Sequence, residues 1–215
     1  MKKIMLSLAV LLVASGAFAQ QRDAKAKELL DAVSNKFKSY SSVLANFSYN
    51  VQNSAGKVLS SKKGTINMKG NMYHIVFGSN KIISDGKTVW NYDPSAKEVT
   101  INDASTNEKT VTPQKIFAGF FDKDFIYAYT GIKKMGAKSV EEVVLQPTDK
   151  SKAFSRVHLW IDRAKSQIVS ANIVEKNGNR YVYTVSSMKP NVAMSDAQFS
   201  FNKASFPGVE VVDLR

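Results

Sequence analysis

The sequence has no cysteine among its 215 residues, and this absence excludes several kinds of structure and chemistry. Without thiols the fold has neither disulfides nor thiolate-bound metal, so its stability must come from a sizeable hydrophobic core. A cysteine nucleophile is excluded for the same reason. No cysteine follows the apolar N-terminal segment either, so the protein cannot itself be acylated there as a lipoprotein.

Recognisable catalytic motifs are missing as well. There is no G-x-S-x-G motif, and Gly86-Lys87-Thr88 has Lys81 where a phosphate-binding loop needs a glycine. The two histidines, His74 and His158, have no cluster of ligand-type residues beside them in the sequence. Glu141-Glu142 are adjacent, so in a strand their side chains would point to opposite faces and could not act as an acid–base pair. We therefore expect no enzymatic activity, no metal site and no cofactor.

Only one apolar run stands out, and it lies at the N-terminus. Two lysines precede an almost unbroken apolar run over residues 4–14, and Ala17-Phe18-Ala19 supplies the small-x-small pattern of a cleavage site. The run is shorter than the roughly 20 apolar residues of a spanning helix. We therefore predict that residues 1–19 are a signal peptide cleaved near Ala19-Gln20, in preference to a fixed membrane anchor. Residues 20–215 would then form a single domain in the periplasm.

The basic residues are mostly lysine. The net charge is +12, or +10 once the two N-terminal lysines have left, and only five of the 30 basic residues are arginine. Lysine is poorly suited to bidentate recognition of phosphates and bases. Lys62-Lys63 and Lys133-Lys134 are the close pairs of the predicted mature chain. A solvated surface is the first interpretation, and attraction to anionic membranes is the second. Nucleic acid comes third, and we expect no nucleic-acid partner.

Hydrophobic periodicity predicts a mainly β fold of the α+β class. Apolar residues recur at steps of three or four from Ala26 to Tyr40, which predicts an amphipathic helix capped by Asp23. The period then changes to two, which predicts antiparallel strands with hairpin turns at Ser54-Ala55-Gly56, Asp85-Gly86 and Asn177-Gly178. We expect a half-open, curved antiparallel sheet, an incomplete barrel, whose concave face is covered by the N-terminal helix and a helical insertion. Periodicity alone leaves a closed barrel filled by its own side chains as the alternative.

The insertion is expected near the middle of the chain. Thr112-Pro113 has the pattern of a helix start, and aromatic residues crowd the segment that follows. The helical segment can run on, broken or bent, through Phe125-Ile126-Tyr127. Near the C-terminus, Phe199 and Phe201 predict a further short strand.

Three stretches of sequence carry a resemblance to a known family. They are Gly64-Thr65-Ile66-Asn67-Met68-Lys69-Gly70-Asn71-Met72-Tyr73, then Ile83-Ser84-Asp85-Gly86-Lys87-Thr88-Val89-Trp90-Asn91-Tyr92-Asp93-Pro94, and the tail Phe199-Ser200-Phe201 with Pro207-Gly208-Val209. Their order and spacing resemble the outer-membrane lipoprotein carrier protein (LolA-like) family over nearly the whole mature chain. The run S-D-G-K-T-x-W-x-Y-x-P is the specific part, whereas the other stretches are common in β-strands.

The resemblance implies a fold and a function. The family fold is a half-open barrel whose helices form a lid over a hydrophobic cavity. Its members take triacylated lipoproteins released by an inner-membrane transporter and pass them to a receptor at the outer membrane. Such a carrier is needed because burying an acyl chain gains about 0.8 kcal/mol per CH₂. A chain of ~16 carbons therefore gains ~12 kcal/mol and cannot cross water unshielded. We expect a monomeric chaperone that works by reversible burial.

The expected site follows from the strand pattern and the resemblance together. The residues predicted to line the lipid-binding cavity are Phe47, Tyr49, Val51, Met68, Tyr73, Ile75, Trp90 and Tyr92. Those predicted to lie on the lid are Ile116, Phe117, Phe120 and Phe121. Any of them can instead be an ordinary core residue.

One position departs from the family pattern. Typical members carry Arg-Pro where this chain has Lys69-Gly70. The resemblance implies that the arginine bonds backbone of the lid and holds the empty cavity shut. Lys69 keeps the charge without the planar fork of donors, and it is the candidate polar residue for closing the lid. The departure leaves two alternatives to the carrier function: a periplasmic sensor or regulatory domain that binds lipid or partner proteins, and a glycolipid-transfer protein.

Overall fold

The computed structural model describes residues 23–105 and 124–215, and its first element is the predicted helix. Helix α1 spans Ala24–Lys38. The Asp23 carboxylate caps it by accepting hydrogen bonds from the backbone N–H groups of Lys25 (2.8 Å) and Ala26 (3.1 Å), which satisfies donors that have no partner inside the helix. The apolar residues of α1 form one buried stripe, as the spacing predicts, and Leu29 belongs to that stripe as well.

The rest of the described chain is one twelve-stranded sheet with short 3₁₀ turns near its C-terminus. The strands are β1 (Val43–Gln52), β2 (Val58–Lys69), β3 (Met72–Phe77), β4 (Asn80–Ser84), β5 (Thr88–Asp93), β6 (Glu98–Asp103), β7 (Phe125–Met135), β8 (Lys138–Pro147), β9 (Phe154–Asp162), β10 (Gln167–Glu175), β11 (Arg180–Pro190) and β12 (Glu210–Asp213). The 3₁₀ helices are η2 (Asp196–Phe199) and η3 (Lys203–Ser205).

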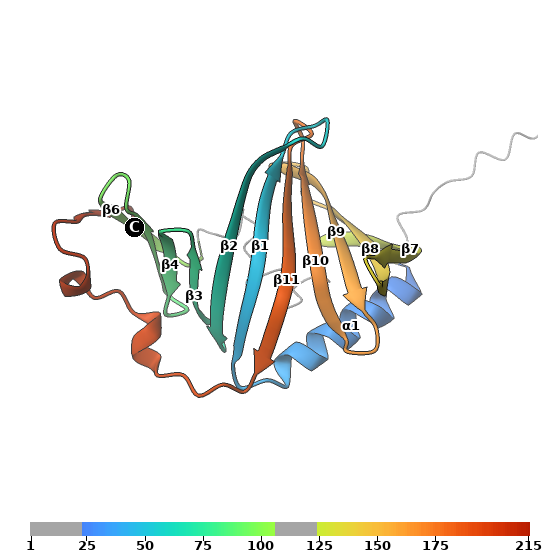
Figure 1. The fold of residues 1–215 in the computed structure, drawn as a ribbon, viewed down its shortest axis with the longest axis horizontal. Helices are drawn as coiled ribbons and strands as arrows, with labels where there is room; N and C mark the ends of the chain where they lie inside the picture. The colour runs from blue at the N-terminus through green and yellow to red at the C-terminus, as the bar shows by residue number, and fades with distance from the viewer. Residues whose placement is uncertain (1–22, 106–123) are drawn as a thin grey trace, which may run out of the picture.

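The sheet is curved and open (Figure 1). Its strand order is β12-β6-β5-β4-β3-β2-β1-β11-β10-β9-β8-β7, and all neighbours are antiparallel except β12, which pairs with β6 in parallel. Most neighbours are joined by tight hairpins because the turn residues suit them. At Asp85-Gly86, for example, the aspartate carboxylate accepts from the N–H groups of Lys87 and Thr88, and the glycine has φ +92°. The predicted half-open sheet is therefore confirmed.

The two faces of the sheet have different coverings. We call the face that carries Phe47 and Tyr49 the inner face, and α1 packs on it against the strands β7 to β10. The opposite, outer face of β3 to β6 is covered by the C-terminal segment, residues 191–209, which runs from the lower end of β11 across to β12 (Figure 1). Phe199 from this segment is fully buried, and Tyr92 lies against Phe206 with 4.8 Å between ring centroids.

Two predicted elements differ from the structure. Residues Phe125-Ile126-Tyr127 begin strand β7 and are not an extension of a helix. Phe199 ends the 3₁₀ helix η2, and Phe201 lies in irregular backbone, so the expected short strand is absent there. In both places aromatic residues at alternate positions fit more than one backbone shape, and long-range pairing decides between them. The predicted signal peptide and the predicted lid residues Ile116, Phe117, Phe120 and Phe121 lie outside the described residues.

Candidate functional site: the inner face of the sheet

The strand register brings most of the predicted cavity residues to one face. Cα pairing aligns Val43 with Met68, Met68 with Tyr73, and Ile66 with Ile75. Partners in a ladder point to the same face, and residues two apart along a strand do too. Six of the eight predicted residues therefore share the inner face: Phe47, Tyr49, Val51, Met68, Tyr73 and Ile75.

The other two predicted residues point the opposite way. Trp90 pairs with Ile83, and Tyr92 pairs with Lys81, whereas Val89 pairs with Ser84 opposite Tyr73. Trp90 and Tyr92 consequently lie on the outer face, under the C-terminal segment, and the prediction that they line the cavity is wrong. Val89 on the inner face of β5 is buried, and Tyr92 on its outer face packs against Phe206, so alternation along the strand does not reveal which face is the inner one.

One half of the inner face is an aliphatic core, which we call the covered half. It consists of α1 and the strands β7 to β10 beneath it. Its central side chains have no exposed surface: Val143, Leu145, Leu159, Ile161 and Ala171. Burying a side chain such as Leu or Ile stabilises the fold by about 1.5–3 kcal/mol, so this half supplies much of the stability.

The other half of the inner face carries a cluster of aromatic rings, which we call the aromatic half. Tyr49 of β1 is its centre, with ring centroids 4.9 Å from Tyr183, 6.1 Å from Tyr181 in a stacked arrangement, and 6.4 Å from Phe77. Phe47 lies 6.2 Å from Tyr183. These distances are in the range where aromatic pairs attract one another beyond their burial. Tyr49, Tyr181, Tyr183 and Phe77 remain only partly buried, in contrast to the covered half.

The phenols of the aromatic half are neutral. Burial raises the pKa of Tyr49 to about 12, and the neighbouring Tyr181 and Glu175 add to the shift. Burial likewise raises the pKa of Tyr183, with the phenols of Tyr49 and Tyr181 as smaller causes. Phenolate formation is therefore suppressed at ordinary pH, because the charged form would lose its hydration. This half presents neutral rings and hydroxyl groups, and the Lys62 ammonium group lies 5.8 Å from the centre of the Phe77 ring.

Polar contacts fix the N-terminal end of α1 over the covered half. The Asp23 carboxylate that caps α1 also accepts from the N–H of Tyr129 in β7 (3.2 Å), and the Asp23 N–H donates to the carbonyl of Tyr127. Farther along, Arg163 bridges Glu28 of α1 (2.7 Å) and the buried Glu141 of β8 (3.4 Å). The start of α1 is thus bonded both to the edge strand and to the sheet beneath it.

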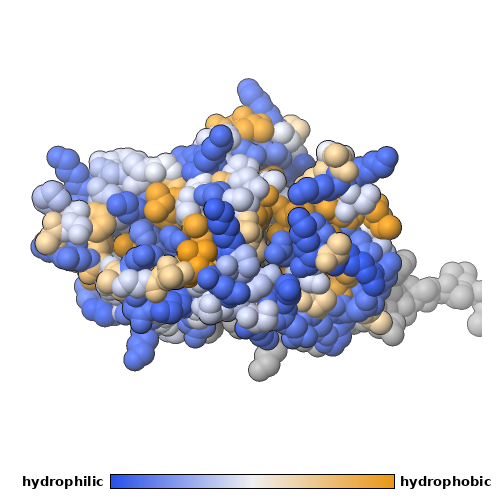
Figure 2. All heavy atoms as spheres, turned by 60° about the horizontal axis from the view of Figure 1, so that its bottom comes forward, coloured by the Kyte–Doolittle hydropathy of each residue, from blue (hydrophilic) through white to orange (hydrophobic). Residues whose placement is uncertain are grey.

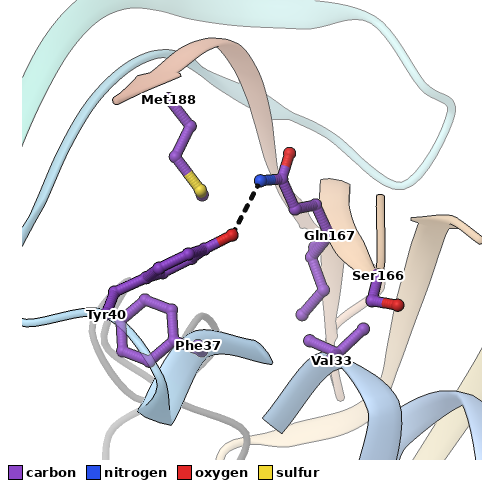
Figure 3. Close-up of a pocket in the computed structure, with 7 residues that line it drawn as sticks. Val33, Phe37, Tyr40, Ser166, Gln167 and Met188 are labelled. Carbon is purple, nitrogen blue, oxygen red and sulfur yellow. Dashed lines mark hydrogen bonds between the residues drawn. The ribbon is translucent and has the colours of Figure 1, made fainter. Parts of the chain in front are cut away.

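A small pocket lies under the C-terminal end of α1 (Figure 3). The Gln167 side-chain amide donates to the Tyr40 hydroxyl (3.4 Å), while Phe37, Val33 and Met188 close the sides. The pocket volume is about 10 Å³, which is room for about one water molecule. An acyl chain needs far more space, so this pocket is a packing gap and not the predicted cavity.

Lys69 makes a contact that the sequence did not predict. Its ammonium group donates to the Asp196 carboxylate (2.6 Å) and to the Met194 carbonyl (3.3 Å), so it holds the C-terminal segment. Lys69 follows Met68, an inner-face residue, and so belongs to the outer face. Its role in closing the lid stays a prediction, because the predicted lid residues lie outside the described residues. A backbone carbonyl does accept from it, as the resemblance suggested, but that carbonyl belongs to the C-terminal segment.

The buried Glu141 and Glu142 take part in two separate sets of structural contacts. Glu141 and Glu142 lie on opposite faces, as predicted: Glu141 meets Arg163 on the inner face, and Glu142 meets His158 (3.0 Å) and Thr130 (2.6 Å) on the outer face. Bonds from Thr130 and His158 outweigh burial and lower the pKa of Glu142.

Among residues 23–105 and 124–215, no three His, Asp or Glu side chains are placed to hold a metal ion. In the same ranges, no helix has the length and hydropathy to cross a bilayer.

Sequence reasoning missed part of the site. Tyr181, Tyr183 and Phe77 are not among the predicted cavity residues, although the turn at Asn177-Gly178 indicates the hairpin to which two of them belong. Pairing of β11 with β1 places Tyr183 opposite Tyr49, and that pairing spans more than a hundred residues of sequence.

The view from the lower end of the sheet shows apolar side chains in patches separated by hydrophilic ones (Figure 2).

Comparison with known proteins agrees with the fold. Residues 38–202 match the family described as outer membrane lipoprotein carrier protein LolA. The outer-membrane lipoprotein carrier protein of Glaesserella parasuis is 30% identical over 222 residues, covering 100% of this chain and 97% of the relative. That of Actinobacillus pleuropneumoniae serotype 7 is 28% identical over 224 residues, covering 100% and 95%. A crystal structure of an uncharacterised conserved protein from Thermus thermophilus shares the fold, with a TM-score of 0.60, 14% identity, and coverage of 88% of this chain and 99% of that one.

Proposed function

Because this chain belongs to the LolA family of outer-membrane lipoprotein carrier proteins, we propose that it carries lipoprotein acyl chains from the inner to the outer membrane. The chains would be shielded against the inner face during transfer through the periplasm. The predicted signal peptide supports export to that compartment. Cargo would be received from a releasing transporter in the inner membrane and given to a receptor at the outer membrane, as in the family that the sequence resembles.

The observation that carries this proposal is the aromatic half of the inner face. Its rings are apolar, uncharged and only partly buried, and they lie on an open sheet next to a fully packed core. An acyl chain laid on them gains about 0.8 kcal/mol for each CH₂ removed from water. No bond is made or broken in such a step, so the function needs reversible burial and no catalytic group.

The hydroxyl groups suit a surface that must also release its cargo. A tyrosine presents a large apolar ring with a polar tip that tolerates water. The aromatic half can therefore be wetted when it is empty, unlike an aliphatic surface of the same size. Binding would then be strong enough to shield the chains and weak enough for transfer to a tighter acceptor.

A pair of adjacent substitutions tests this proposal. Tyr49→Glu places a carboxylate on the aromatic half, where a charge buried against apolar cargo is costly. Asn50→Glu is the matched control, because Asn50 is the next residue of β1, has the same intermediate burial and points to the outer face. We expect Tyr49→Glu to reduce release of lipoprotein from inner-membrane vesicles to near background, and Asn50→Glu to behave like the parent protein.

Two readouts separate loss of binding from loss of fold. Thermal unfolding of both variants shows that each is folded at the assay temperature, and binding of a fluorescent fatty acid reports on the surface without any protein partner. Normal lipoprotein release by a folded Tyr49→Glu protein would contradict the proposal, and so would equal loss in both variants.

A further inference from the structure

The hairpin between β1 and β2 projects beyond its neighbours on one side. Strand β3 pairs with β2 only from Gly64 to Lys69, and the Gly78 N–H donates to the Lys63 carbonyl just beyond that ladder, so among the described strands residues 58–62 of β2 pair with β1 alone. In Figure 1, β1, β2, β10 and β11 rise to a common end, well above the shorter strands β3 and β4. We call this end, residues 53–63 with the β10–β11 turn at 176–179, the hairpin end.

Two adjacent apolar side chains are exposed there. Val58 is 51% exposed and Leu59 is 59% exposed. In a regular strand neighbouring residues point to opposite faces, but here the register shifts: Gln52 pairs with Val58 and Val51 pairs with Ser60. Leu59 is therefore the extra residue of a β-bulge, a feature that redirects side chains and is often found beside functional sites.

The hairpin end is held in place by its own hydrogen bonds. Asn53 accepts from the Lys57 N–H through its side chain (2.9 Å) and donates its own N–H to the Lys57 carbonyl (3.0 Å). The two turns also touch, because a Cβ atom added to Gly178 would lie 2.8 Å from Cβ of Ser54. Val58 and Leu59 are thus displayed by an ordered support.

Within residues 53–63 the charge has one sign. Residues 53–63 read Asn-Ser-Ala-Gly-Lys-Val-Leu-Ser-Ser-Lys-Lys and contain no acidic residue. Lys57, Lys62 and Lys63 are all exposed, so they flank the apolar pair on both sides. Apolar side chains ringed by lysine fit the interface of an anionic bilayer, where the apolar atoms leave water and the ammonium groups lie at the level of the phosphates.

We propose that the hairpin end is a docking surface for anionic lipid bilayers. Val58 and Leu59 enter the headgroup region, and the three lysines bind the surface electrostatically. This interaction goes beyond the carrier function and does not depend on it, because it requires neither cargo nor a protein receptor. Tyr49 lies three residues from the end of β1, so docking would bring the aromatic half close to the membrane.

Co-flotation of the purified mature protein with lipid vesicles tests the proposal. We expect binding to vesicles of equal parts phosphatidylglycerol and phosphatidylcholine, and little binding to phosphatidylcholine alone. Leu59→Ser should weaken binding about tenfold, from the apolar area that it removes. Lys62→Gln and Lys63→Gln should each weaken it about fivefold, and high salt should weaken it further because the Debye length falls from ~10 Å at 0.1 M to ~3 Å at 1 M.

Ile132→Ser is the matched control. Ile132 is 66% exposed on the edge strand β7, so it offers a similar apolar side chain away from the hairpin end. Its loss should leave flotation unchanged. Fatty-acid binding should be unchanged in Leu59→Ser, Lys63→Gln and Ile132→Ser, whereas Lys62 lies over the Phe77 ring of the aromatic half and is left out of that control. Failure of the parent to float with anionic vesicles would overturn the proposal, as would equal loss in Leu59→Ser and Ile132→Ser. Normal flotation of Leu59→Ser with impaired transfer to a receptor would overturn it in favour of a protein partner.

Discussion

The two halves of the inner face lie on one continuous sheet but differ in chemistry. The covered half is aliphatic, has no exposed surface at its centre, and is fastened to α1 by a cap and a charge network. The aromatic half has partly buried tyrosine and phenylalanine rings, and its tyrosines carry hydroxyl groups. The buried core continues into β1 to β3, where Ala45, Ile66 and Ile75 are at most 1% exposed. We therefore assign stability to this core and propose binding for the partly buried rings beside it.

The largest change in stability is expected from a cavity in the covered half. Leu159 of β9 is fully buried, so Leu159→Ala should lower the free energy of unfolding by about 2–5 kcal/mol. Denaturant titration measures the loss. Fatty-acid binding by the fraction that remains folded should be unchanged, because the aromatic half is intact. A stability loss below about 1 kcal/mol would show that the covered half is not the main core.

The next largest change in stability is expected from loss of the hydrogen bonds that hold the start of α1. Asp23→Ala removes the helix cap and the bond to Tyr129, and it should cost about 0.5–2 kcal/mol. The hydrogen bond from Ala26 is the largest influence lowering the pKa of Asp23 in the folded protein. Its stabilisation is therefore present above the pKa of about 3.9 of an unfolded aspartate and is lost as pH falls through the lower folded value. Acid unfolding curves should show a smaller drop below about pH 4 in the variant. Identical acid sensitivity of both proteins would contradict this role.

The smallest of the three expected changes in stability concerns Tyr49 in the aromatic half. The pKa of Tyr49 is raised to about 12, so the folded protein keeps this proton when an unfolded chain would lose it. Stability is therefore full below about pH 10 and falls as pH rises towards 12. Tyr49→Phe should change stability by less than about 0.5 kcal/mol at neutral pH and should reduce the alkaline loss. Absorbance of phenolate during titration measures this, and a Tyr49 phenol that ionises near its ordinary pKa would count against burial.

Local signals predicted the secondary structure well. The helix spacing, the Asp23 cap and the turns at Gly56, Gly86 and Gly178 are each encoded within a few residues, and the structure confirms them. Sequence periodicity also placed the six inner-face residues of β1 to β3 together. These features need no knowledge of the rest of the chain.

The errors lie where distant segments decide the outcome. Trp90 and Tyr92 alternate correctly along β5, but the C-terminal segment, about a hundred residues later, covers the face on which they lie. The unforeseen contact of Lys69 with Asp196 likewise spans 127 residues of sequence. The bulge at Leu59 depends on the register of β1 against β2, which hydrophobic pattern does not specify in polar strand ends. Pairing partners, and not propensity, set these features.

The central claim is that acyl chains contact the aromatic half of the inner face. The two native tryptophans, Trp90 and Trp160, both lie on the outer face, so they serve as internal controls. A fluorescent reporter is added to the aromatic half by Tyr183→Trp in a protein that carries Trp90→Phe and Trp160→Phe. Each protein is loaded with a fatty acid brominated along its chain, and the quenching of tryptophan fluorescence is measured. We expect strong quenching of the inner tryptophan and little quenching of the native pair. Quenching of the native pair alone, or of neither, would contradict the account.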